Sequence, residues 1–272
     1  MENYDLERIK SVIQRAQSGQ ELTIGFLGGS ITQGSLATEH ENTYAYRVYK
    51  WWCDTFPQAK FNYVNGGIGG TDSYYGVSRA VTDVLMYQPD FVVVDFSVND
   101  VDNIYCEETF EGVLRTLLCW SSRPAVVVLN NVFYDTGVST QDIHNRLADH
   151  YGVPHVSVHD TIYRRMKAGE YNRIDITPDG LHPNDKMRIW LMTQIRIPQM
   201  LARTQRMISR TNQPAHVYFL PLLPQMLMSM QRGLPYARYV LSFQGSGLIL
   251  MRRWDTLIIS RMDGQVYMPV IA

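Results

Sequence analysis

Residues 90–100, DFVVVDFSVND, combine an almost continuous apolar run with a polar end. A strand that is covered on one face only alternates apolar and polar residues, whereas a strand covered on both faces does not. The first part of the stretch, residues 90–97, therefore predicts a buried strand of a parallel sheet. Its polar end, Ser97-Val98-Asn99-Asp100, predicts a loop at the carboxyl end of that strand.

Four further short, β-rich runs resemble this one, and helical patterns separate them. The other predicted strands are 22–28, 61–65, 125–130 and 154–158. The predicted helices are 3–18, 42–56, 73–86, 107–121, 139–151 and 160–168. Five such strands with intervening helices predict a five-stranded parallel sheet in a three-layer α/β/α sandwich. In that architecture the functional residues lie on loops beyond the carboxyl ends of the strands.

The bulk composition is that of an ordinary globular protein. The 272 residues are 45% hydrophobic and 19% charged with a net charge of −1, which gives no reason to expect a nucleic-acid partner. This average hides an asymmetry along the chain. Residues 1–186 contain 15 of the 25 bases and 24 of the 26 acids, whereas residues 187–272 contain ten arginines, two aspartates, and neither lysine nor glutamate.

The three cysteines, Cys53, Cys106 and Cys119, are odd in number and lack CxxC spacing, so they predict neither disulfides nor a zinc site. The N-terminal residues, MENYDLERIK, contain no apolar leader, and no segment reaches the ~18 apolar residues of a membrane span. We therefore expect a cytoplasmic protein without a membrane partner. The oligomeric state stays open.

After the first predicted strand, Gly28-Gly29-Ser30-Ile31-Thr32 presents a serine on a glycine turn. This is a suitable position for a nucleophile, although Thr32 replaces the last glycine of the G-x-S-x-G elbow of α/β-hydrolases. The alternative is that Ser30 is the N-cap of the following helix. This segment alone leaves both interpretations open.

Two further loops carry candidate hydrogen-bond donors. Residues 65–71, NGGIGGT, form neither G-x-G-x-x-G nor a P-loop, which argues against nucleotide binding. Their glycines permit close backbone approach, so they supply either oxyanion donors or a flexible turn. Asn99, after the third predicted strand, is likewise either an oxyanion donor or a turn residue.

Asp179-Gly180-Leu181-His182 places a carboxylate and an imidazole three residues apart. On a turn, this spacing lets the carboxylate accept a hydrogen bond from one ring nitrogen while the other nitrogen faces a nucleophile. A serine hydroxyl needs such a base because it is a poor nucleophile at neutral pH. The combination of serine, glycine, asparagine and Asp-x-x-His is therefore chemically coherent.

In this order, GGSIT, NGGIGG, SVND and DGLH resemble the four sequence blocks of the SGNH hydrolases, also called the GDSL family. The resemblance covers roughly residues 22–186, and GGSIT in place of the commoner GDS is similar to a carbohydrate-esterase-like branch. It implies a flavodoxin-like fold that uses neither a cofactor nor a metal.

The resemblance also implies roles for individual residues. Ser30 is the nucleophile, His182 is the general base and then the acid, and Asp179 orients His182. The implied oxyanion donors are the backbone amides of Ser30 and Gly70 and the side-chain amide of Asn99. A one-residue shift of the alignment would replace Gly70 by Gly69 in this set of donors.

The expected activity is that of a serine esterase acting on a small-molecule or oligosaccharide ester, most simply an acetyl group on a carbohydrate. The substrate class rests on the GGSIT-type resemblance and on nearby aromatic residues, of which Tyr74 and Tyr75 directly follow the glycine loop. One alternative is a lipid esterase, such as a lysophospholipase or thioesterase. Another is an inactive carbohydrate-binding protein on the same fold.

Other polar and aromatic residues receive structural interpretations. Histidines within 144–159 are expected to be structural or solvated; His155 and His159 have metal-pair spacing, but His155 falls in a predicted strand. Asp72 and Asp100 are expected to be cap or turn residues. Aromatic residues of the second predicted helix are expected in the core rather than in a sugar-stacking wall. These are Tyr44, Tyr46, Tyr49, Trp51 and Trp52.

The family pattern stops after Lys186. We assign residues 1–205 to the hydrolase domain and residues 206–272 to a C-terminal extension. Residues 187–210, interrupted by Pro198, are the candidate for the family's closing helix. Strand-like runs within residues 238–271 predict a small antiparallel β appendage. The simultaneous loss of lysine, glutamate and the family pattern also fits a shift of reading frame near Lys186, which would leave a poorly packed tail.

Overall fold

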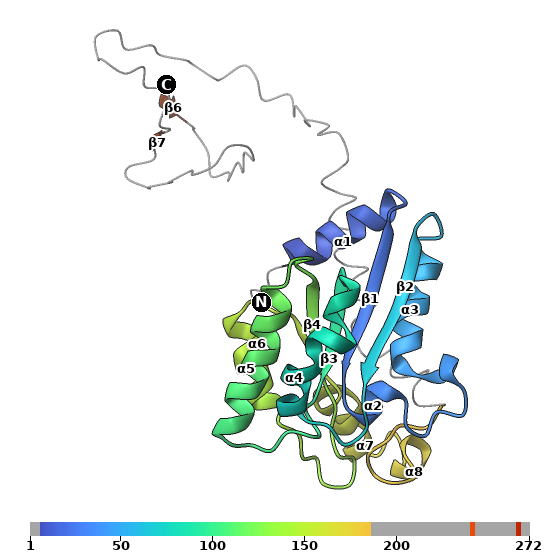
Figure 1. Cartoon of the computed structure of the whole chain (residues 1–272). Helices are drawn as coiled ribbons and strands as arrows, with labels where there is room; N and C mark the ends of the chain where they lie inside the picture. Colours follow the sequence, from blue (N-terminus) through green and yellow to red (C-terminus); the bar gives the residue numbers. More distant parts are fainter. Residues whose placement is uncertain (1–5, 186–239, 243–264, 268–272) are drawn as a thin grey trace. The chain divides into compact units, whose positions relative to one another are not determined.

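The computed structural model describes residues 6–185, 240–242 and 265–267 (Figure 1). The chain divides into two compact units, residues 1–212 and 213–272. The first contains a five-stranded sheet with the order β2-β1-β3-β4-β5, and each neighbouring pair is parallel. Its strands are β1 (Glu21–Gly28), β2 (Lys60–Gly67), β3 (Phe91–Asp95), β4 (Ala125–Asn130) and β5 (His155–Ser157). The predicted five-stranded parallel sheet is confirmed.

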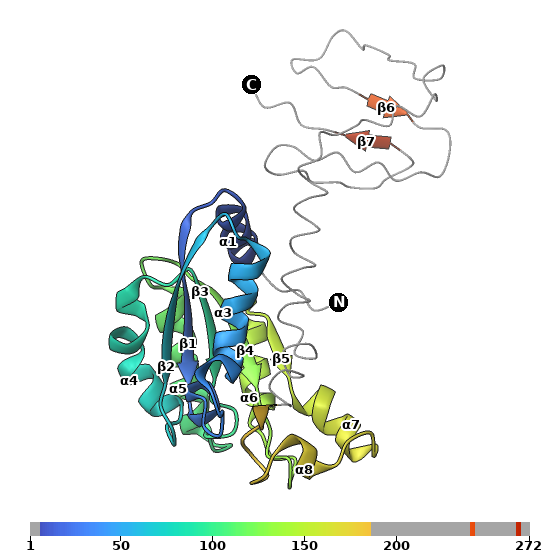
Figure 2. The ribbon, with the colours of Figure 1, turned by 90° about the vertical axis from the view of Figure 1, so that its right-hand side faces the viewer.

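Helices cover both faces of this sheet (Figure 2). One face packs against α1 (Glu7–Gln17) and α3 (Tyr44–Thr55). The opposite face packs against α4 (Ser73–Asp83), α5 (Ile104–Leu118) and α6 (Gln141–His150). The shorter helices are α2 (Ser30–Gln33), η1 (His40–Asn42), η2 (Leu85–Tyr87), η3 (His159–Tyr163), α7 (Arg164–Lys167) and α8 (Arg173–Ile176).

The central strand β3 explains why its sequence is apolar throughout. Phe91 and Val93 point into the core beneath α1 and α3, whereas Val92 and Val94 point into the core beneath α4, α5 and α6. All four side chains are fully buried. Successive residues of a strand face opposite sides, so a strand covered on both sides needs apolar residues at every position.

The helix boundaries differ from the predictions where side chains bond to the backbone. Helix α5 begins at Ile104 rather than residue 107, because the Asn103 side chain accepts a hydrogen bond from the Cys106 N–H at 3.0 Å. The predicted helix over 160–168 is a π-helical turn, η3, followed by α7. The short α8 was not predicted. It has only four residues, about one helical turn, which is too short to produce a periodic pattern in the sequence.

In the second unit, β6 (Val240–Ser242) pairs with β7 (Gln265–Tyr267) in antiparallel fashion. Both strands lie within residues 238–271, where the sequence predicts a β appendage. The predicted closing helix within 187–210 and the other strand-like runs lie outside the described residues. The boundary at residue 205 and the frame shift near Lys186 stay predictions.

Gly76 provides a test of how closely the helical layer packs on the sheet. A Cβ on Gly76 in α4 would lie 2.5 Å from Cζ of the buried Phe96. We expect Gly76→Ala to destabilise the protein by about 1–3 kcal/mol through overpacking, as measured by urea unfolding.

The matched control is Gly112→Ala on α5, where the nearest atom to a Cβ is Val77 Cγ2 at 3.2 Å. Alanine's higher helix propensity, worth about 1 kcal/mol over glycine, should offset much of that contact. Equal destabilisation by the two substitutions would contradict the packing argument.

Candidate active site

Ser30 is the first residue of α2, directly beyond the carboxyl end of β1 (Figure 1). The N–H of Gly29 donates to the carbonyl of Asp95 on the neighbouring strand at 3.2 Å. A Cβ on Gly28 would lie 2.2 Å from Thr32 Oγ1, so this tight turn needs glycine. Gly29 is the N-cap of α2, so the alternative interpretation of Ser30 as the N-cap is wrong.

His182 and Asp179 meet Ser30, although 152 sequence positions separate Ser30 from His182. His182 Nε2 lies 2.8 Å from Ser30 Oγ, and His182 Nδ1 lies 2.6 Å from Asp179 Oδ2. Partial burial favours protonation of Asp179, but hydrogen bonds from His182, the Leu181 N–H and Thr177 outweigh it and hold the Asp179 pKa below its usual range. An ionised Asp179 favours a proton on Nδ1, which leaves Nε2 free to accept one from Ser30.

The loop that carries Asp179 and His182 has anchors on both sides. Gly180 has a φ of +82°, and its carbonyl accepts a hydrogen bond from the Tyr134 N–H at 2.7 Å. A Cβ on Gly180 would lie 2.0 Å from a carboxylate oxygen of Asp135. Beyond His182, the Asp185 carboxylate accepts from the Thr38 N–H at 3.1 Å and from Asn42 Nδ2 at 3.0 Å. The loop is therefore tied to two other segments of the domain.

Asn99 lies on the loop after β3, close to the Ser30 turn. A Cβ on Gly29 would lie 2.2 Å from Asn99 Oδ1 and 3.3 Å from the Thr71 carbonyl oxygen. The loops after β2 and β3 therefore both press against the residue that precedes Ser30. Within residues 6–185, the Asn99 side-chain amide forms no hydrogen bond to protein.

The two glycines that the sequence could not distinguish differ in their contacts. The Gly69 N–H donates to Gln33 Oε1 at 2.8 Å. Gly70 has a φ of +73°, and its N–H has no protein acceptor among the residues that the structure describes. Of the two amides, that of Gly70 is therefore the one with its donor unused.

A buried polar network that the sequence analysis did not predict supports the Ser30 turn. Asp95 Oδ2 accepts hydrogen bonds from Thr32 Oγ1 at 3.2 Å and from Asn131 Nδ2 at 2.9 Å, and the Tyr44 hydroxyl lies 2.7 Å from Thr32 Oγ1. Burial raises the pKa of Asp95 to about 7, against these hydrogen bonds. The sequence signal that could have revealed this network is Asp95, an acidic residue within the otherwise apolar stretch 91–96.

The predicted substrate-binding residues Tyr74 and Tyr75 lie in the first turn of α4 with 65% and 57% of their surface exposed. Their rings pack edge to face with centroids 5.8 Å apart. The Tyr75 N–H donates to Asp72 Oδ1 at 3.1 Å, so the prediction of Asp72 as a cap is confirmed. The pair therefore presents two exposed aromatic rings shortly after the glycine loop.

The residues interpreted as structural occupy structural positions. Tyr44 and Trp52 are buried, and Tyr49 and Trp51 pack against the same core, as expected. Tyr46 is half-buried and its ring contacts Tyr49.

The His155 and His159 side chains contact different carboxylates, those of Asp149 and Asp160, at 3.1 and 2.9 Å. Neither contact brings the two imidazoles to a shared ligand position. Among the described residues, no helix has the length and hydropathy needed to cross a membrane.

Asp95 predicts a distinctive dependence of stability on pH. Between pH 4 and 7 the unfolded chain releases the Asp95 proton before the folded protein does, so wild-type stability contains a component that falls as pH rises. Asp95→Asn removes this component. We expect its free energy of unfolding, relative to wild type, to increase by up to about 4 kcal/mol between pH 4 and pH 8, since one pKa unit corresponds to about 1.4 kcal/mol. Urea titrations across this range measure the difference, and a constant difference would contradict the raised pKa.

The model of the GDSL-like lipase/acylhydrolase family matches residues 26–188. A comparison with curated proteins found no significant match.

Two solved structures share more than 40% sequence identity with this chain. A two-domain esterase (CEX) active on acetylated mannans, co-crystallized with mannopentaose, is 46% identical with a TM-score of 0.73, and the match covers 75% of this chain and 55% of that one. A second structure of a two-domain esterase active on acetylated mannans is 43% identical with a TM-score of 0.73, covering 84% of this chain and 62% of that one. This chain thus spans a little over half the length of these esterases.

An acetylxylan esterase from Geobacillus stearothermophilus, solved as a catalytic mutant, shares the fold alone. It is 14% identical with a TM-score of 0.54, and the match covers 65% of this chain and 93% of that one. Because the family model covers more than half of the chain and includes every loop described above, the chain belongs to the GDSL-like lipase/acylhydrolase family.

Proposed function

We propose that this chain is a serine esterase that removes acetyl groups from a carbohydrate. The observation that carries the proposal is the hydrogen-bonded series from Ser30 Oγ through the His182 ring to Asp179, with distances of 2.8 and 2.6 Å. His182 accepts the Ser30 proton through Nε2 as Oγ attacks the ester carbonyl, and then protonates the sugar oxygen as its bond to the carbonyl carbon breaks. A water molecule, deprotonated by His182, then attacks the acetyl-enzyme; the bond to Ser30 Oγ breaks, Oγ takes the proton back from His182, and acetate is released.

The tetrahedral intermediate needs donors for its negative oxygen. The backbone N–H groups of Ser30 and Gly70 and the Asn99 side-chain amide are the three we assign to this role. The unused donors of Gly70 and Asn99, and the closeness of Asn99 to Gly29, support the assignment.

The carbohydrate substrate is supported by two independent features. The similar structures at 43% and 46% identity are described as esterases active on acetylated mannans. In this chain, the exposed rings of Tyr74 and Tyr75 lie just after the glycine loop, where they suit stacking against a sugar. An acetylated oligosaccharide is therefore the substrate class we propose.

Removal of the nucleophile and of one oxyanion donor should have different effects. Ser30→Ala should abolish acetate release and labelling by a fluorophosphonate, with circular dichroism unchanged. Asn99→Ala should lower kcat by about 10²-fold or more while KM changes little, because its donor acts on the intermediate. Full esterase activity of a verified Ser30→Ala preparation would refute the mechanism, and absence of fluorophosphonate labelling in the wild type would favour a non-catalytic binding protein.

The two tyrosines test the substrate class. Tyr74→Ala and Tyr75→Ala should raise KM for acetylated manno-oligosaccharides several-fold and leave the hydrolysis of ethyl acetate unchanged, because ethyl acetate has no ring that could stack on a tyrosine. Tyr87→Ala is the matched control: Tyr87 is 53% exposed but lies in η2, before the amino end of β3. Faster hydrolysis of long-chain than of short-chain p-nitrophenyl esters, with no acetate released from oligosaccharides, would instead indicate a lipid esterase.

A further inference from the structure

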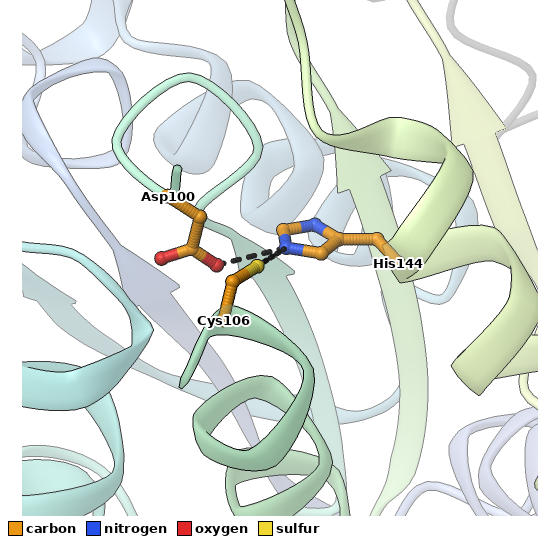
Figure 3. A group of neighbouring side chains, drawn as sticks. All are labelled: Asp100, Cys106 and His144. Carbon is orange, nitrogen blue, oxygen red and sulfur yellow. Dashed lines mark hydrogen bonds and ion pairs between the residues drawn. The ribbon is translucent and has the colours of Figure 1, made fainter. Parts of the chain in front are cut away.

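A buried cluster of side chains that includes Asp100, the residue after Asn99, has no role in the mechanism above. It contains Asp100 from the loop after β3, Cys106 from the first turn of α5 and His144 from α6 (Figure 3). His144 is fully buried, and the Asp100 side chain is only 2% exposed. Burying a carboxylate and an imidazole is unfavourable unless both are well paired, so their pairing needs an explanation.

Asp100 joins the two loops that carry the proposed oxyanion donors. Its Oδ1 accepts a hydrogen bond from the Ser73 N–H at 2.7 Å, at the start of α4 and shortly after Gly70. Its Oδ2 lies 2.8 Å from His144 Nε2. Asp100 directly follows Asn99 in the chain, so a displacement of this carboxylate would move the backbone that carries the Asn99 amide.

His144 is held rigidly from several directions. Its ring stacks on Phe110 with centroids 3.6 Å apart and an interplanar angle of 4°. Its Nδ1 lies 3.2 Å from Asn130 Oδ1 at the end of β4. Thr140, four residues earlier, donates through its N–H to the Ser97 carbonyl at 2.8 Å, which ties the start of α6 to the same loop. The imidazole is therefore a fixed point from which Asp100 is oriented.

A metal ion is a less suitable explanation of the cluster. One donor atom from each of the three side chains lies within 4.8 Å of the others, which is compatible with a cation. However, both Asp100 oxygens already accept hydrogen bonds, and burial raises the pKa of the Cys106 thiol to about 12, which disfavours the thiolate that a cation would need.

We propose that His144 is a positioning residue which, through its hydrogen bond to Asp100, holds the Asn99 and Gly70 loops in the geometry that stabilises the oxyanion. This inference rests on the proposed function, because it assigns His144 a role in the same reaction. His144 touches no reacting atom; it acts through Asp100. His144 lies outside the four sequence blocks, on helix α6.

The test compares two substitutions of His144 by kcat and KM for p-nitrophenyl acetate. His144→Phe keeps an aromatic ring against Phe110 but removes the donor to Asp100, and we expect kcat to fall about tenfold or more with little change in KM. His144→Gln keeps an N–H near the position of Nε2, and we expect kcat within about threefold of wild type. Equal kcat for folded His144→Phe and wild type would overturn the proposal.

A double-mutant cycle with Asn99→Ala separates positioning from general loss of stability. If His144 acts through the oxyanion donors, His144→Phe should cost much less in the Asn99→Ala background than in the wild type. Fully additive losses would overturn the proposal. If His144→Phe does not fold, Asp100→Ala breaks the same link from the other side and replaces it in the cycle with the same two outcomes.

Asp90→Asn is the control for structural damage. Asp90 is also a buried carboxylate that accepts a backbone hydrogen bond, from the Thr23 N–H at 2.7 Å, but it precedes β3 at the opposite end of the strand. We expect it to lower stability without lowering kcat; a kcat loss equal to that of His144→Phe at equal stability would overturn the proposal. Wild-type activity that survives Ser30→Ala would refute the proposed function, whereas Ser30-dependent activity that is insensitive to His144 would refute only this inference.

Discussion

The hydrogen bond between Ser30 Oγ and His182 Nε2 depends on a turn with no space around it for side chains. A Cβ would lie 2.2 Å from another atom at each of three glycines: Gly28 against Thr32, Gly29 against Asn99, and Gly67 against the backbone nitrogen of Gln33. None of these three has a positive φ, so close approach rather than conformation requires glycine there. This tight packing brings the ends of β1, β2 and β3 together around Ser30.

Close packing at the site is accompanied by buried acids at the end of β3. Asp95 supports the Ser30 turn through Thr32, and Asp100 ties the Asn99 loop to α4 and α6. One Asp95 oxygen is buried without a partner among the described residues, which is unfavourable for stability. Rigid placement of the donors before substrate binds is what an oxyanion hole requires, so a loss of stability at these positions is consistent with function.

The sequence predicted the sheet and the residues at its carboxyl edge, but not the interactions that hold them. Continuous apolar runs such as 90–97 identify buried strands because strands buried on both faces are apolar at nearly every position, and local motifs gave Ser30, Asn99, Asp179 and His182 as candidate site residues. Asp100 was interpreted as a cap or turn residue; it does accept a backbone N–H, yet from Ser73 on another loop, and its second partner lies on α6. Such partners are distant in sequence, so no local pattern reveals them.

The compositional break near Lys186 lies only four residues after His182, so it raises the question of what supports the His182 loop. The family model ends at residue 188, close to where lysine and glutamate disappear from the sequence. An altered C-terminal segment could weaken the loop if its anchors came from that segment. Within residues 6–185, the loop is anchored by Thr38, Asn42 and Tyr134, which bond to Asp185 and Gly180. All of these contacts lie before Lys186, so a change of sequence after Lys186 leaves them in place. Residues 1–186 therefore themselves supply contacts that support the geometry of Asp179 and His182.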